Sequence, residues 1–88
     1  MKIKKNSKSV TLVGVLKTIY KNEHLVIETK EGEICLILCI DNLPVIGAIF
    51  KVKGIIDNDK EHAIGPYKRV MDVKELIKMN ETEMNNLS

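Results

Sequence analysis

Apolar residues alternate with polar or small ones through most of this chain, and a period of two is typical of β-strands rather than helices. In the run VTLVGVLKTIY the alternation places Leu12, Gly14 and Leu16 on one face. Gly, Asn or Asp separates each such run from the next. The sequence therefore predicts five strands, at residues 10–20, 24–30, 34–40, 49–56 and 67–73.

A helix is predicted to follow the last strand. Asp72 and Glu75 have the spacing of a capping box. Several apolar residues from there on fall on one helical stripe, which could plug the barrel or bind a partner: Val73, Leu76, Ile77, Met84 and Leu87. We therefore expect a basic leader at residues 1–8, a five-stranded Greek-key barrel at 9–73, and a C-terminal helix with a frayed tail at 74–88.

At 88 residues the chain is expected to form one domain, near the size at which small domains gain stability from a partner. Residues 1–22 hold six lysines and no acid, although the net charge is only +2. This asymmetry indicates either a nucleic-acid-facing arm or a solvated leader. The longest apolar run has seven residues, far below the roughly 20 of a membrane span. Because the N-terminus also lacks the pattern of a signal peptide, an intracellular protein is expected.

The two segments VTLVGVLKTIYKNEHLVIETKEGEI and LPVIGAIFKVKGII, with Gly14 and Gly54 inside strands, resemble an oligonucleotide/oligosaccharide-binding (OB) fold. The compact form, without a further domain, is similar to the smallest subunits of replication protein A and of the related telomeric CST complex. The resemblance covers about residues 9–80. It implies a nuclear small subunit that joins larger OB-fold subunits through its C-terminal helix and contributes to assembly more than to strand binding.

The two cysteines, in the run ICLILCI, do not predict a metal or disulfide site. The C-x3-C spacing on a strand puts Cys35 and Cys39 on one face but about 13 Å apart. A zinc site needs four ligands, and only His24 and His62 remain to complete it. Both cysteines are interpreted as small hydrophobic residues, and no cofactor is expected.

The alternation predicts an apolar outer face on the second and third strands. If Ile34 and Leu36 fill the barrel, the opposite face carries Cys35, Ile37 and Cys39, without aromatic rings or positive charge. Binders of single strands stack bases on aromatic rings and contact phosphates with cations. This face is therefore predicted to be covered by another protein or by the chain's own helix.

Candidate nucleic-acid contacts lie elsewhere in the sequence. Two tyrosines and several cations fall in segments that can border one groove of an OB barrel: Lys17, Tyr20, Lys21, Lys51, Lys53, Tyr67, Lys68 and Arg69. The alternative is that the tyrosines cap the barrel and the lysines are simply solvated. So few phosphate contacts predict weak binding by the chain alone.

No catalytic motif is present, since neither a nucleophile elbow, an HExxH helix nor a phosphate-binding glycine loop occurs. An enzyme is therefore not expected. Three hypotheses follow: an assembly subunit of a complex that binds single-stranded DNA, a self-sufficient binder of single-stranded DNA or RNA, and a barrel in a protein complex without nucleic acid.

Overall fold

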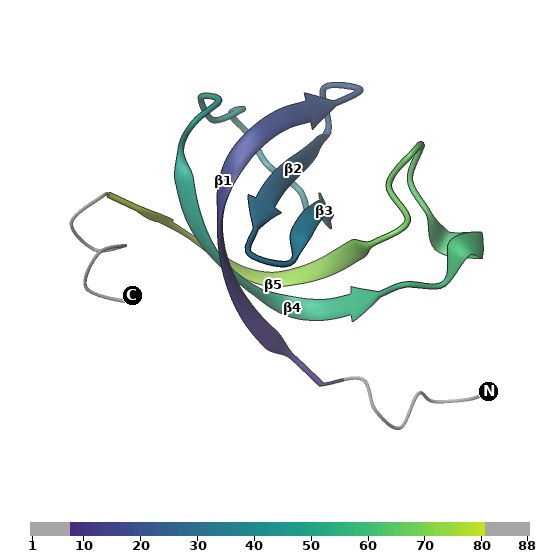
Figure 1. The fold of residues 1–88 in the computed structure, drawn as a ribbon. Helices are drawn as coiled ribbons and strands as arrows, with labels where there is room; N and C mark the ends of the chain where they lie inside the picture. The colour runs from purple at the N-terminus through teal and green to yellow at the C-terminus, as the bar shows by residue number, and fades with distance from the viewer. Residues whose placement is uncertain (1–7, 81–88) are drawn as a thin grey trace.

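The computed structural model describes residues 8–80, which form a closed five-stranded β-barrel (Figure 1). The strands follow one another around the barrel in the order β1-β2-β3-β5-β4, and β4 pairs with β1 to close it. All neighbouring strands are antiparallel except β3 and β5, which are parallel. The elements are β1 (Val10–Tyr20), β2 (His24–Thr29), β3 (Gly32–Ile37), β4 (Ile49–Asp57), the 3-10 turn η1 (Lys60–His62) and β5 (Val70–Met79). The expectation of an all-β, five-stranded barrel is confirmed.

The inner faces of the strands form one core, as the alternation predicts. The fully buried residues of this core come from all five strands, so burial of apolar surface holds the barrel together: Leu16, Leu25, Ile27, Ile34, Leu36, Phe50, Val52 and Met71. Leu12, Leu38 and Ile40 pack against this core while remaining half-buried.

Glycine at two strand positions allows neighbouring backbones to approach closely. A Cβ atom on Gly14 would lie 2.7 Å from the carbonyl oxygen of Glu28, and one on Gly54 would overlap the carbonyl oxygen of Asp72. Glycine inside a strand is typical of such contacts and of sharp bends. Gly14 lies in β1, which pairs with β2 along one part of its length and with β4 along another.

A β-bulge in β1 keeps its apolar residues on the core side. Leu16 pairs with Ile27 but Thr18 pairs with Val26, so Lys17 is the extra residue. A bulge adds one residue to one strand and shifts the alternation beyond it. Leu16 and Ile19 therefore both face the core, although they are three residues apart.

The predicted helix is wrong for residues 74–79, which belong to β5. This strand pairs with β4 from Val70 to Met79. A second bulge, at Lys74, explains the misleading pattern, because Gly54 pairs with Val73 while Lys53 pairs with Glu75. Val73 and Leu76 consequently both pack against the core at a spacing of three, which imitates a helical stripe. Met84 and Leu87 lie outside the described residues.

Other strand ends differ from the sequence prediction. β3 ends at Ile37 instead of residue 40, and β5 starts at Val70 instead of residue 67. Leu38 and Ile40 keep the predicted inward direction without strand pairing. Alternation of side chains therefore continues beyond the hydrogen-bonded ladder that defines the strand. The expected leader at residues 1–8 lies almost entirely outside the described residues.

Gly54→Ala is expected to destabilise the barrel more than Gly14→Ala, because both Cβ atoms would meet a backbone carbonyl but the contact with Asp72 is much closer than the contact with Glu28. Overpacking costs about 1–3 kcal/mol, and we expect Gly14→Ala inside that range and Gly54→Ala at or above its upper end. Urea denaturation followed by far-UV circular dichroism measures both, with exposed Ser9→Ala as the control. Wild-type stability of Gly54→Ala would contradict the close approach.

Candidate functional site

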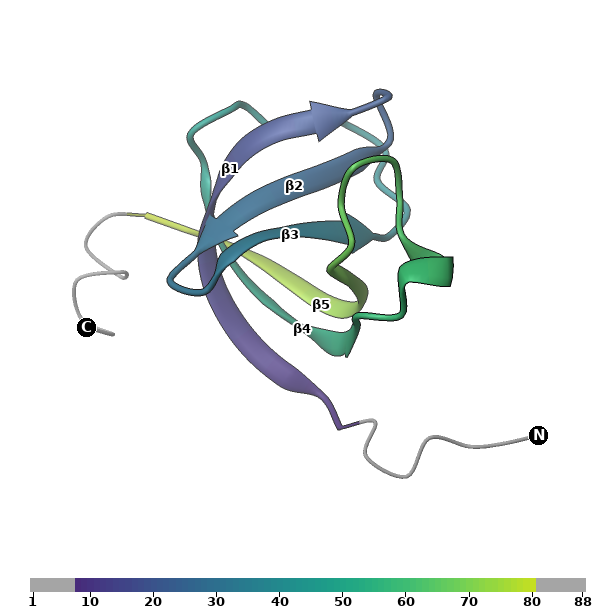
Figure 2. The ribbon, with the colours of Figure 1, turned by 45° about the vertical axis from the view of Figure 1, so that its right-hand side comes forward.

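The loop between β4 and β5 covers part of the outer face of β2, β3 and β5. Val26, Cys35 and Val70, one from each strand, are fully or almost fully buried on this outer side. Tyr20, Ile64 and Tyr67 pack against them. Figure 2 shows the loop crossing this side of the barrel. Cys35, which the sequence places on a face open to a partner, is instead buried, and a loop rather than a helix covers it.

Two features hold this loop in place. One is a contact between two tyrosine rings, and the other is a tight turn. The Tyr20 and Tyr67 rings meet edge to face with centroids 5.5 Å apart. Ile64 and Tyr67 exchange two backbone hydrogen bonds of 2.9 and 3.0 Å. Gly65, in this turn, has a positive φ of 56°, and a Cβ there would overlap the Tyr20 hydroxyl. The edge of one ring, a face of the other and the hydroxyl end of Tyr20 are therefore already in contact with the protein itself.

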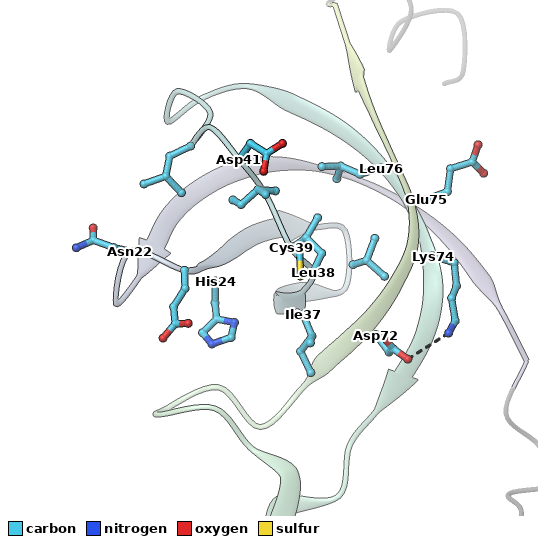
Figure 3. Close-up of a pocket in the computed structure, with 14 residues that line it drawn as sticks. Asn22, His24, Ile37, Leu38, Cys39, Asp41, Asp72, Lys74, Glu75 and Leu76 are labelled. Atoms are coloured by element: carbon cyan, nitrogen blue, oxygen red, sulfur yellow. Dashed lines mark hydrogen bonds and ion pairs between the residues drawn. The ribbon is translucent and has the colours of Figure 1, made fainter.

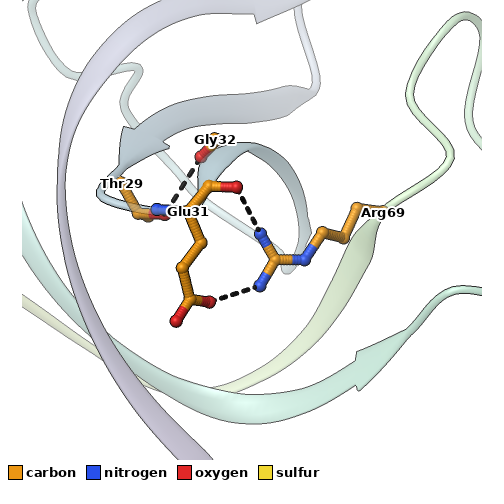
Figure 4. A network of polar contacts seen from close by, with 4 residues as sticks. All are labelled: Thr29, Glu31, Gly32 and Arg69. Atoms are coloured by element: carbon orange, nitrogen blue, oxygen red, sulfur yellow. Dashed lines mark hydrogen bonds and ion pairs between the residues drawn. The ribbon is translucent and has the colours of Figure 1, made fainter.

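Lys17 and Arg69 are both predicted to contact nucleic acid, but each forms ion pairs with acidic side chains of the protein itself. Lys17 contacts Glu33 and lies 3.3 Å from Glu28, and hydrogen bonds to these carboxylates raise the pKa of the ammonium group. Arg69 lies 3.0 Å from the Glu31 carboxylate and also points at the Glu31 carbonyl oxygen, so it ties the β2–β3 turn to the start of β5 (Figure 4). Both positive charges are offset by neighbouring acids.

The remaining predicted cations do not gather into one groove. Lys21 lies 5.5 Å from the centre of the Tyr20 ring, and Lys68 is exposed next to Tyr67. Lys51 and Lys53 lie on β4, which has β1 and β5 as neighbours and is not adjacent to β2 or β3. The structure therefore brings Tyr20, Lys21, Tyr67 and Lys68 to one region and places Lys51 and Lys53 in another.

A groove of about 840 Å³ opens where β3 and β5 separate. It is bounded by the β1–β2 turn, by residues 37–43 and by β5 from Asp72 onward. Figure 3 shows His24 and Ile37 on the side of β2 and β3, with Asp72 and Lys74 on the facing strand β5. Four residues predicted to form a partner interface line this groove: Ile37, Cys39, Val73 and Leu76. The other two described residues of that prediction lie outside the groove: Cys35 is buried under the loop before β5, and Ile77 lies beside Lys51 and Lys53.

The groove combines apolar walls with a negative rim. Four acids line it, namely Glu23, Asp41, Asp72 and Glu75, against the single cation Lys74. Lys74 is already 3.3 Å from the carboxylate of Asp72. The Nδ1 atom of His24 is buried in the groove wall without a hydrogen-bond partner among the described residues. A polyanion such as DNA would be repelled by this rim, whereas a basic segment would be attracted.

A cluster of exposed apolar side chains adjoins the groove. Leu43, Val45 and Ile46 are 46%, 75% and 54% exposed, and Leu43 also lines the groove. We call Leu43, Val45 and Ile46 the apolar loop. This segment falls between the strands predicted at residues 34–40 and 49–56, and its exposed apolar surface was not predicted. Three large apolar residues within four positions of a connecting segment were the signal that could have identified it.

Metal and membrane sites are not evident within residues 8–80. No three His, Cys, Asp or Glu side chains of this region are placed to hold a metal ion. None of its helical segments has the length and apolar character needed to cross a bilayer.

Comparisons with known proteins give no match: no family model, no curated protein and no solved structure is significantly similar to the chain.

Cys39 is expected to react quickly with a water-soluble disulfide reagent at pH 8, and Cys35 slowly. Cys39 is exposed, whereas burial raises the pKa of Cys35 to about 11. A pKa two units above the ordinary value lowers the reactive thiolate fraction about 100-fold. One equivalent should therefore react in the native protein and a second after denaturation. Tyr20→Ala should accelerate the reaction of the Cys35 thiol, and Tyr20→Phe should not. Equal reaction rates of the two thiols in the native protein would contradict burial of Cys35 under the loop.

Proposed function

We propose that this chain is a small OB-type barrel that acts by docking to other proteins, as an assembly subunit of a larger complex. The closed five-stranded barrel with β3 and β5 parallel supports the OB assignment. The resemblance to the smallest subunits of replication protein A and of the CST complex extends the proposal. On that basis the complex binds single-stranded DNA, contains larger OB-fold subunits and acts in the nucleus.

The observation that carries the docking proposal is the apolar loop. Val45 is 75% exposed and Ile46 54% exposed, next to Leu43 and the groove. Contiguous exposed apolar side chains of this size are typical of protein interfaces, because water contact with them is unfavourable. Four residues predicted as a partner interface lie in the adjoining groove, so the two features form one continuous surface.

The distribution of charge supports docking to a protein over independent binding of single-stranded nucleic acid. Lys17 and Arg69 are paired with acids, and the groove itself is rimmed by carboxylates. The outer face of β2 and β3, which OB-fold proteins use for oligonucleotides, is partly covered by the loop that carries Tyr67.

A self-sufficient binder of single-stranded DNA or RNA is the second candidate. Tyr20 and Tyr67 lie side by side with Lys21 over the Tyr20 ring, and an aromatic pair beside a cation is a platform for stacked bases. In this candidate Lys68 contacts the phosphates, whereas Lys51 and Lys53 lie apart from the tyrosine pair on β4.

The docking proposal is tested with the tagged chain expressed in cells of its source. Val45→Asp/Ile46→Asp is expected to lose the co-purifying partner, because two charges enter the interface. Val10→Asp/Val15→Asp introduces the same two charges at exposed apolar positions on β1 and should retain the partner. Retention of the same partner by Val45→Asp/Ile46→Asp would rule out docking through the apolar loop.

Direct binding of a labelled 20-nucleotide single-stranded DNA separates the two candidates. We expect no saturable binding by the isolated chain at physiological salt, because Lys17 and Arg69 are paired with acids and the other cations predicted to contact nucleic acid lie in two separate regions. Fluorescence anisotropy at two salt concentrations measures this. Tight binding that weakens with salt and is lost in Tyr20→Ala, but not in Tyr20→Phe, would replace the docking proposal with the binding module.

A further inference from the structure

The pairing between β3 and β5 is short, and it leaves a free strand edge. Only Cys35–Ile37 pairs with Val70–Asp72. From Val73 to Met79, β5 pairs with β4 on one side and with no strand on the other among residues 8–80. A strand directs about half of its backbone N–H and C=O groups to each side. The far edge of β5 therefore offers unpaired donors and acceptors, along the groove as far as Leu76 and beyond it to Met79.

The chain that could have paired with this edge moves away from it. After Ile37, residues 38–40 keep the strand-like alternation, with Leu38 and Ile40 packed on the core, but they are not part of β3. The groove occupies the space between these residues and β5. Its apolar walls are formed by side chains that point into the barrel from both borders, including Val73 and Leu76.

We propose that this groove binds an extended, basic segment of a partner protein, which adds as a strand to the free edge of β5. The proposal rests on the docking function above and names the site and the chemistry of the partner. Strand addition supplies backbone hydrogen bonds, and side chains on alternate positions supply specificity. The free edge spans seven residues, or about 23 Å, which matches a partner strand of about six or seven residues.

The negative rim selects the charge of the partner. Asp72 is neutralised by Lys74, and Glu23, Asp41 and Glu75 have no cation within salt-bridge distance among the described residues. A strand with lysine or arginine on one face and apolar residues on the other fits this surface. Its cations meet the carboxylates, and its apolar side chains meet Ile37, Leu43 and Leu76.

The same charges disfavour a second copy of this chain as the occupant. Symmetric pairing of two β5 edges would bring two acidic rims together, because a two-fold interface places the same patch on both sides. Pairing centred on Leu76 would also place Lys74 opposite Lys78 of the copy, and charged edge positions are a common protection against self-pairing.

The test uses the purified chain and a nine-residue peptide in which lysine alternates with valine. We expect amide resonances of residues 73–79 to shift on titration and Cys39, which lines the groove, to be protected from alkylation. Binding should weaken as salt increases. A peptide of the same composition with alternate backbone nitrogens methylated, and one with glutamate in place of lysine, should each bind at least tenfold more weakly, or by about 1.4 kcal/mol.

Variants of the chain locate the binding site. Asp41→Lys/Glu75→Lys should lower the affinity for the basic peptide at least tenfold, whereas Glu61→Lys, an equally exposed acid in η1, should leave it unchanged. Equal binding of the N-methylated peptide would overturn strand addition. Concentration-dependent dimerisation through β5, with no peptide binding, would overturn the basic partner in favour of a second copy.

The two proposals fail separately. If the peptide does not bind and Asp41→Lys/Glu75→Lys keeps the native partner, while Val45→Asp/Ile46→Asp loses it, the groove inference is wrong and docking through the apolar loop stands. If none of these variants loses the partner, both are wrong.

Discussion

Three residue pairs join β3 to β5, and both the loop-covered outer face and the groove depend on them. Cys35 pairs with Val70 at the first of these positions, and the Arg69 carbonyl accepts a hydrogen bond from the Cys35 amide. On one side of this closure the loop before β5 lies over the outer face. On the other side β3 ends, β5 continues, and the groove opens. A longer ladder would have filled the groove with the chain's own strand.

The sequence could predict the strands because alternation follows directly from the geometry of extended backbone. Leu25, Ile27, Ile34 and Leu36 all occupy the predicted inner face. Local bulges were the source of the main error, since a single extra residue at Lys74 converts a period of two into a spacing of three. No pattern in a single sequence separates that spacing from a helix turn.

The candidate site was harder to predict, because it depends on contacts between distant segments. Ile37 and Cys39 were expected to face a partner, as were Val73 and Leu76, but on two different elements. The parallel pairing of β3 with β5 brings all four to one groove. The burial of Cys35 could not be predicted either, because it depends on Ile64 and Tyr67 folding back over it from a distant loop. The acidic rim likewise combines residues from three segments that carry no local charge pattern.

The free energies of apolar burial and base stacking explain why the covered outer face favours docking to a protein over binding of single-stranded nucleic acid. Burying a large apolar side chain contributes about 1.5–3 kcal/mol, and Ile64 and Tyr67 both pack against the buried outer cluster. Stacking a base on an aromatic ring contributes about 1–3 kcal/mol. A nucleic acid that displaced the loop to reach this face would therefore lose about as much as it gained from the two tyrosines. The apolar loop and the free edge of β5 require no such displacement, so the proposed protein partner would gain the full contact energy there.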